Sequence, residues 1–132
     1  MIKINRKLCT GCRICEMICS LAHEGVINPK LSRIRILSDW PKEEKIQVCV
    51  ACKSKNCIEA CKEKALSWDA TLILNEQKCN LCFACVEACS LKGIRLESSK
   101  KYPFFCDICG GNFECVKWCP PKAIVRMERN EK

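Results

Sequence analysis

The sequence has few large aromatic side chains: four Phe, three Trp and one Tyr among 132 residues. Domains of this length usually carry more of them in the core. No apolar run approaches the roughly 18 residues of a membrane-spanning helix, and TLIL and IQVCVAC are typical of the runs present. The opening segment MIKINRKL lacks the apolar stretch and cleavage site of a signal peptide. We therefore expect a cytoplasmic protein without a membrane span, whose core is completed by something other than side chains.

Recognisable catalytic machinery is also missing. The sequence contains no GxGxxG motif and no P-loop, and the single histidine, His23, has no evident nucleophile to serve. We expect His23 to pack or hydrogen-bond near Cys106 rather than to act as an acid. The chain is therefore expected to be non-catalytic.

Cysteine, by contrast, is abundant. The 16 cysteines form four groups of four, each beginning with CxxC and ending with CxxxC. Groups one and three, CTGCRICEMIC and CNLCFACVEAC, have the spacing that bacterial ferredoxins use to bind 4Fe-4S clusters. Groups two and four, CVACKSKNCIEAC and CDICGGNFECVKWC, have a wider middle gap. The pattern predicts four 4Fe-4S clusters with these ligands: Cys9, Cys12, Cys15 and Cys19; Cys49, Cys52, Cys57 and Cys61; Cys79, Cys82, Cys85 and Cys89; Cys106, Cys109, Cys115 and Cys119.

Two other uses of many cysteines fit less well. Disulfide scaffolds are typical of secreted proteins, and no secretion signal precedes Cys9. Structural zinc is the stronger rival, because four-cysteine zinc sites are built from CxxC pairs. Such pairs are usually separated by a spacer, whereas each group here spans only 11 to 14 residues. A structural zinc-binding module stays open as a remote alternative.

The formal net charge of +8 would by itself suggest nucleic acid or an anionic membrane as a partner. Sixteen thiolates would contribute about −16 and four oxidised clusters about +8, which brings the loaded protein close to neutrality. The Lys and Arg residues are scattered and are not interleaved with aromatic side chains. We therefore expect no nucleic-acid partner.

Short alternating apolar stretches between the cysteine groups predict strands. Residues 65–74 (ALSWDATLIL) are expected to form a hairpin with its turn near Asp69. Segments next to each third cysteine, such as CVEACSL, predict one or two helical turns. The fold class is therefore α+β, with short β-hairpins and short helices around the clusters. The other strands are expected within residues 31–37, 45–50 and 93–96.

The strands suggest tandem, nested dicluster ferredoxin-like modules within a single unit of 132 residues. Groups two and three flank the hairpin and, with strands at 46–48 and 94–96, would form an inner module of about residues 45–97. Strands at 2–5 and 123–127 could pair and close an outer module from residues 1–44 and 98–132. A sequential pairing of groups one with two and three with four stays open, although residues 20–48 would then form a long connection.

The number, order and widened gaps of the cysteine groups resemble the four-cluster polyferredoxin subunits of molybdenum and tungsten oxidoreductases, including the small subunit of dimethyl sulfoxide reductase. The stretch CTGCRICEMICSLAHEGVINPKLSRIRI further resembles the small subunits of the tungsten aldehyde oxidoreductase and benzoyl-CoA reductase family. The resemblance implies an electron-transfer subunit docked on a larger catalytic subunit, favouring a tungsten or molybdenum enzyme, with ferredoxin or another redox subunit as a further partner. A free polyferredoxin, or a subunit of a hydrogenase or carbon monoxide dehydrogenase, is the alternative.

The resemblance also implies that the fourth cysteine of each group binds the cluster of its partner group. Only Cys119 is followed by the proline (Pro120) that often shapes the turn after this ligand. The implied ligand sets are Cys9, Cys12, Cys15 and Cys119 for cluster 1; Cys106, Cys109, Cys115 and Cys19 for cluster 2; Cys49, Cys52, Cys57 and Cys89 for cluster 3; and Cys79, Cys82, Cys85 and Cys61 for cluster 4.

Three smaller expectations concern residues outside the ligand sets. The tryptophans Trp40, Trp68 and Trp118 are expected to pack and exclude water rather than to carry electrons. The glycines Gly11, Gly110 and Gly111 are expected to let the backbone approach cluster sulfide closely. The charged end, residues 126–132, is expected to be solvated.

Overall fold

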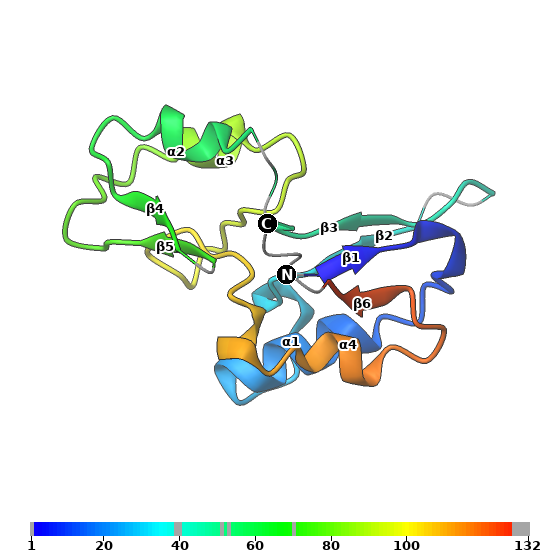
Figure 1. The fold of residues 1–132 in the computed structure, drawn as a ribbon. Helices are drawn as coiled ribbons and strands as arrows, with labels where there is room; N and C mark the ends of the chain where they lie inside the picture. Colours follow the sequence, from blue (N-terminus) through cyan, green and yellow to red (C-terminus); the bar gives the residue numbers. More distant parts are fainter. Residues whose placement is uncertain (1, 39–40, 51, 53, 70, 128–132) are drawn as a thin grey trace.

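The structure is a computed structural model that describes residues 2–38, 41–50, 52, 54–69 and 71–127. It has short helices and strands arranged in two parts (Figure 1). The first part contains β1 (Ile2–Ile4), α1 (Ile14–Glu24), β2 (Arg35–Leu37), β3 (Lys45–Gln47), α4 (Glu114–Trp118) and β6 (Ile124–Arg126), and the second contains α2 (Asn56–Ala60), β4 (Leu66–Trp68), β5 (Leu72–Leu74) and α3 (Ala84–Ala88). Single 3-10 turns lie at η1 (Arg6–Leu8), η2 (Pro29–Leu31) and η3 (Ile108–Gly111).

The described strands form three antiparallel pairs. The first and last strands, β1 and β6, pair with Ile4 opposite Ile124, as the sequence suggested for the two ends of the chain. The expected hairpin is formed by β4 and β5, with Trp68 opposite Leu72. The third pair joins β2 to β3. Because each sheet has only two strands, strand pairing alone cannot stabilise the protein.

The prediction of a strand over residues 93–96 was wrong. Within that segment Arg95 makes an isolated bridge to Phe104, and no strand is formed by these described residues. Lys92 directly before it has a φ of +53°, so the chain is turning where a strand would have to begin. The strand expected next to it at 46–48 is present as β3 but pairs with β2 instead.

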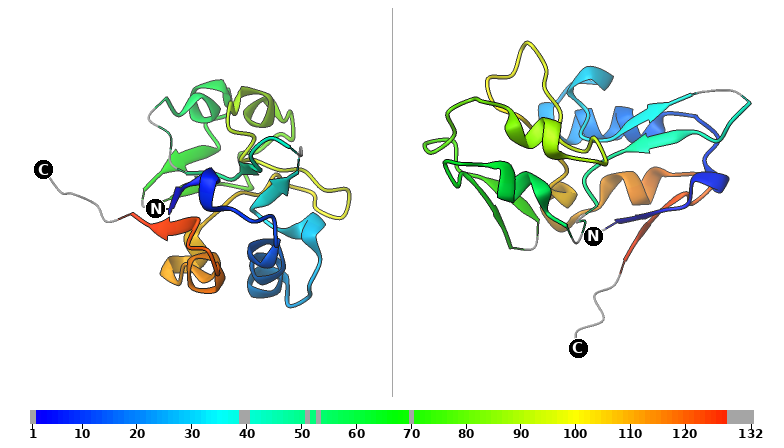
Figure 2. Two further views of the ribbon diagram at one scale, coloured as in Figure 1. Left: turned by 90° about the vertical axis from the view of Figure 1, so that its right-hand side faces the viewer. Right: turned by 90° about the horizontal axis from the view of Figure 1, so that it is seen from above.

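The helices pack in two pairs, one in each part of the molecule. Helices α1 and α4 lie side by side, and so do α2 and α3 (Figure 2). Three of the four have the expected one to two turns, but α1 has 11 residues. It ends at Gly25, whose φ of +72° lets its N–H bond to the carbonyl of Leu21. None of the helices in the described residues is long and apolar enough to cross a membrane.

Two separate apolar cores correspond to the two parts. The larger contains Ile36 and Ile46 from the β2–β3 pair together with Ile124 from β6, and the smaller contains Leu66 and Leu72 from the hairpin. Cysteine side chains belong to both cores. The shortage of aromatic residues is therefore offset partly by cysteines, whose thiols behave as small apolar groups when buried. The buried cysteines are Cys15, Cys19, Cys57, Cys85, Cys115 and Cys119.

Candidate metal centres

None of the 16 cysteines is in a disulfide bond, and the fold brings cysteines distant in sequence together. One enclosed cavity is lined by three cysteines of group one and by the last cysteine of group four. Apolar side chains of β2, β3 and β6 complete its wall. The β1–β6 pair and the α1–α4 contact bring the two ends of the chain to this cavity. Its lining includes Cys9, Cys12, Cys15, Cys119, Ile36, Ile46 and Ile124.

A second enclosed cavity lies beside the first. It is lined by three cysteines of group four and the last cysteine of group one, with apolar side chains from both ends of the chain. The ligand types are the same as in the first cavity, with the contributions of the two groups exchanged. Its lining includes Cys19, Cys106, Cys109, Cys115, Ile2, Ile34, Val48 and Phe113.

Groups two and three come together in the smaller part of the molecule. Burial, followed by the nearby charges of Cys49, Cys89 and Cys52, raises the pKa of the Cys57 thiol to about 11. Burial also raises the pKa of Cys85, and the charges of Cys61 and Cys79 add to the effect. Cys82 belongs to the same loop and is exposed. In both sets the charge of the last cysteine of one group, Cys89 or Cys61, reaches the third cysteine of the other, Cys57 or Cys85.

Thiols of different sets affect one another electrostatically. Burial raises the pKa of Cys115, and the charge of Cys15 in the first set contributes. Burial raises the pKa of Cys106 to about 12, and here Cys49 of the third set contributes. The second set therefore has thiols close enough to the first and the third to affect their charges, and groups two and three meet at the α2–α3 contact.

Backbone N–H groups point at several of the thiols. The Cys61 and Cys89 sulfurs each accept an N–H bond of 3.3 Å, from Ala65 and Gly93 respectively. The Arg33 N–H donates to the Cys19 sulfur at 3.2 Å. Such bonds stabilise negative charge on a sulfur atom that binds a metal.

The backbone around each group repeats one conformation. The residue before each helix has a left-handed φ, at Arg13, Lys55, Phe83 and Phe113. Three residues after the fourth cysteine, Lys64, Lys92 and Lys122 are also left-handed and donate their N–H to that cysteine's carbonyl. The turn therefore forms after Cys61 and Cys89 without the proline that follows Cys119. Strained backbone at repeated positions is typical of functional loops.

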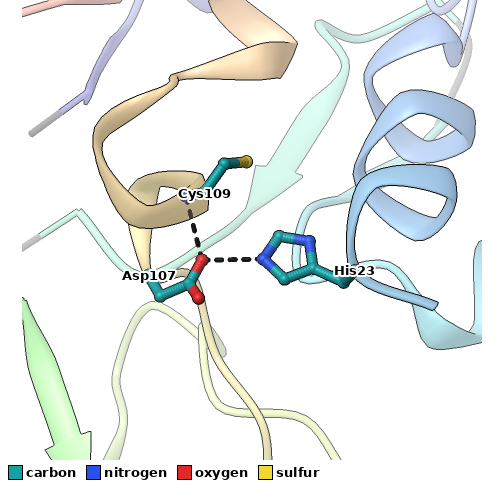
Figure 3. A group of neighbouring side chains, drawn as sticks. All are labelled: His23, Asp107 and Cys109. Carbon is teal, nitrogen blue, oxygen red and sulfur yellow. Dashed lines mark hydrogen bonds and ion pairs between the residues drawn. The ribbon is translucent and has the colours of Figure 1, made fainter. Parts of the chain in front are cut away.

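His23 lies against the second cavity, as expected (Figure 3). Its Nε2 is 2.7 Å from Asp107 Oδ1, and its Nδ1 is 2.8 Å from the Cys19 carbonyl oxygen. The Asp107 carboxylate also accepts the Cys109 N–H at 2.9 Å. The bonds to Asp107 and then Cys19 raise the pKa of His23 to about 10, and His23 in turn lowers the pKa of Asp107. The pair fixes the loop that carries Cys109 to the end of α1.

Hydrogen bonds also act on Cys19 itself. Burial alone would raise its pKa, but bonds from His23, the Arg33 N–H and Ser32 lower it below the ordinary value. By contrast, burial and then the charge of Glu16 raise the pKa of Cys15 to about 12. Two cysteines of one helix therefore lie in opposite electrostatic surroundings.

The smaller expectations had mixed outcomes. Trp68 packs against the smaller core as expected, but Trp118 is 55% exposed and lies beside Leu21 in a surface groove. Trp40 is outside the described residues. At Gly110 and Gly111 no protein atom would meet an added Cβ, and both glycines have the left-handed φ of their turn; their approach to cluster sulfide stays a prediction. In the charged end, Arg126 belongs to β6, and residues 128–132 are outside the described part.

Sequence reasoning missed two residues that the structure makes prominent. Glu16 is buried beside Cys15, although a Glu next to CxxC motifs reads as an exposed helix residue. Gly93 packs so closely on the next loop that an added Cβ would lie 2.5 Å from the Cys49 nitrogen. A comparison of equivalent positions among the four groups could have found both, because the other three groups carry Ile or Val at the position of Glu16, and two of them carry Ala at the position of Gly93.

The donor set suits iron-sulfur clusters. The first two cavities each gather four cysteines, and the other two sets consist of cysteines as well. Four thiolates are the ligands that a 4Fe-4S cluster takes. Burial raises the pKa of several thiols, Cys57, Cys85 and Cys106 among them, and metal binding would release the proton from such a thiol. N–H bonds to sulfur and the apolar walls are further features of such sites.

Three comparisons place the chain among known proteins. It is 44% identical over 121 residues to the "Aliphatic sulfonate oxidoreductase, polyferredoxin-like subunit" of Pyrococcus furiosus, covering 89% of this chain and 70% of that protein. It is 31% identical to the putative electron transport protein YsaA of Escherichia coli (strain K12), covering 91% and 84%. The fold is similar to a chain of the active site complex BamBC of benzoyl coenzyme A reductase, with a TM-score of 0.56, 24% identity, and coverage of 98% of this chain and 79% of that one. No model of a known protein family matches the chain.

Proposed function

Because the chain belongs to the family of polyferredoxin-like electron-transfer subunits of oxidoreductases, we propose that it binds four 4Fe-4S clusters and relays electrons to or from the active site of a larger catalytic subunit. The observation that carries this proposal is the convergence of thiols from distant groups around shared cavities. A bound 4Fe-4S cluster supplies reversible one-electron chemistry. The protein itself is a non-catalytic subunit in this proposal.

The proposed ligands are the nested sets. Cys9, Cys12 and Cys15 act with Cys119, and Cys106, Cys109 and Cys115 act with Cys19, which the linings of the two cavities support. In the smaller part, Cys49, Cys52 and Cys57 act with Cys89, and Cys79, Cys82 and Cys85 act with Cys61, which the mutual effects on the thiol pKa values support. The sequential pairing has no such support.

The surrounding residues hold and insulate the four sets. Left-handed backbone at Arg13, Lys55, Phe83 and Phe113 directs each third cysteine inward at the start of a helix. N–H groups supply hydrogen bonds to sulfur, and isoleucine, valine and phenylalanine side chains exclude water from the first two cavities. Thiols of different sets lie close enough to affect one another's pKa, which supports electron transfer from one centre to the next.

We further propose that the unit consists of two nested modules. The two apolar cores support an inner and an outer module. Because β3 packs in the larger core, the inner module begins closer to residue 49 than to 45, and it extends to about residue 97. The outer module consists of the remaining residues at both ends. Sixteen cysteines without a disulfide suit a reducing compartment, which supports a cytoplasmic location.

The proposed partner is the catalytic subunit of a tungsten or molybdenum oxidoreductase of the aldehyde-oxidoreductase type. The name of the Pyrococcus relative, a subunit of an oxidoreductase, supports a permanent complex. The similarity to the Escherichia coli electron transport protein, which matches along most of its length, favours a second candidate, a free electron carrier.

Purification without oxygen from the native organism tests the partner. A tagged copy of the chain should retain a larger subunit through several columns, and metal analysis of the complex should find tungsten or molybdenum. The same tag on an unrelated protein from the same cells controls for capture through the tag. Recovery of the chain alone, with iron but without a second subunit, would support the free carrier instead.

A further inference from the structure

Glu16 occupies a position where the other three groups have an aliphatic residue. This position directly follows the third cysteine, and it holds Ile58, Val86 and Val116 in groups two, three and four. Those three side chains pack against the apolar cores. Glu16 is only 2% exposed, so the first group buries a carboxylate where its repeats bury hydrocarbon. A substitution of this kind is costly for stability and therefore needs a functional reason.

The contacts of this carboxylate leave much of its charge uncompensated. Oε1 accepts the Ile36 N–H of β2 at 2.6 Å. Oε2 lies 3.6 Å from a guanidinium nitrogen of Arg13, whose side chain is 50% exposed. Among the described residues, no group donates a hydrogen bond to Oε2. A buried charge with one hydrogen bond and one partly solvated counter-charge acts strongly on its surroundings, because little water screens it.

The first cavity is directly beside this charge. Glu16 follows Cys15 in the first turn of α1, and its hydrogen-bond partner Ile36 lines the same cavity as Cys9, Cys15 and Cys119. Glu16 is therefore linked through the backbone to the ligand Cys15 and through a hydrogen bond to Ile36 in the cavity wall. The glutamates at the start of the other short helices differ, since Glu59 and Glu87 are exposed.

We propose that Glu16 lowers the reduction potential of the centre held by Cys9, Cys12, Cys15 and Cys119. This inference rests on the proposed function. One-electron reduction adds a negative charge to a 4Fe-4S centre, and net charge near the centre is one of the factors that set its potential. A fixed buried carboxylate next to a ligand opposes that added charge. Glu16 acts through its charge and does not ligate, so it is a positioning residue that tunes the first centre.

The test is the Glu16→Gln variant of the complete, anaerobically prepared holoprotein. Gln has the same size and keeps an oxygen that can accept the Ile36 N–H. Reductive titration with dithionite, followed by electron paramagnetic resonance, gives the midpoint potentials. We expect one midpoint to move to a more positive value, the other three to stay in place, and iron and sulfide contents to be unchanged. The signal that moves should be the one that is lost in Cys12→Ala.

Two kinds of further variant make the result decisive. The exposed glutamates provide matched controls, and neither Glu59→Gln nor Glu87→Gln should move a midpoint. Arg13→Gln removes the counter-charge and should move the same midpoint in the negative direction, which keeps the inference testable if Glu16→Gln loses iron. Four unchanged midpoints in both variants, with full iron content, would overturn the role of Glu16 and leave the proposed function intact. Wild-type protein without iron and sulfide would overturn the proposed function itself.

Discussion

Gly93 is not a proposed ligand, but its packing positions the loop that carries the proposed ligand Cys49. The position four residues after the fourth cysteine holds alanine in two other groups, as Ala65 and Ala123, but glycine here. An added Cβ at Gly93 would lie 2.5 Å from the Cys49 nitrogen and 2.7 Å from the Val48 carbonyl carbon. Both atoms belong to the backbone, so neither can move aside cheaply.

We therefore expect Gly93→Ala to displace the loop that carries Cys49. The variant should lose roughly a quarter of the bound iron, because one 4Fe-4S centre of four depends on this loop. The reciprocal change Ala65→Gly is the control, and it should keep full iron with a cost of about 1 kcal/mol or less. Iron analysis after anaerobic purification distinguishes the two. A Gly93→Ala protein with wild-type iron content would contradict the close approach.

Residue types indicate candidate ligands more readily than the residues that support them. Cysteine spacing pointed to all 16 thiols, because chelation of one cluster limits how far apart its first three ligands lie in sequence. The glycines selected from the sequence, Gly110 and Gly111, have the left-handed φ that their turn requires. Gly93 and Glu16 depend on contacts between distant segments, and only the folded chain reveals such contacts.

At the level of elements, the side chain of Arg95 links the segment after α3 to the first part of the molecule. Arg95 donates hydrogen bonds to the carbonyl oxygens of Ser32 and Pro29, and its guanidinium lies 5.8 Å from the centre of the Phe104 ring. Arg33 lies 5.4 Å from the same ring, and its N–H donates to the Cys19 sulfur. The segment after α3 is in this way fixed to the segment that supports the second ligand set.

Arg95→Gln should loosen this connection. The loss of charge-assisted hydrogen bonds to two carbonyl groups is expected to cost about 1–3 kcal/mol, and visible absorbance of the bound clusters should then bleach at lower urea concentration than in wild type. Arg126→Gln is the matched control, because Arg126 lies 4.9 Å from the Phe113 ring within one part of the molecule. Equal bleaching of both variants would show that the Arg95 contacts do not connect the parts.

The elements themselves were predicted with uneven success. Hairpin β4–β5 and the pairing of β1 with β6 followed from alternating apolar residues. Helix α1 extends beyond its predicted two turns, because Ser20 and the chain around it are buried against the segment that follows. The predicted strand at 93–96 failed because a left-handed Lys92 and the packing of Gly93 interrupt it. Tertiary contacts overrode local pattern in both cases.

At the level of the whole molecule, nesting predicts which cysteines fail together. If Cys12 and Cys119 serve one centre, Cys12→Ala/Cys119→Ala should lose about the same iron as either single variant. Cys12→Ala/Cys19→Ala should lose about twice as much, because Cys19 serves the neighbouring centre. Iron and sulfide contents of the two double variants decide between the pairings. The opposite pattern, with the greater loss in Cys12→Ala/Cys119→Ala, would rule out the nested ligand sets.

The central claim is that the chain holds four iron-sulfur centres. Its most direct test is the content of iron, acid-labile sulfide and zinc per chain in protein prepared without oxygen. The account predicts about sixteen iron and sixteen sulfide with little zinc, as four 4Fe-4S clusters require. About four zinc without sulfide would contradict it and would make the chain a structural zinc protein.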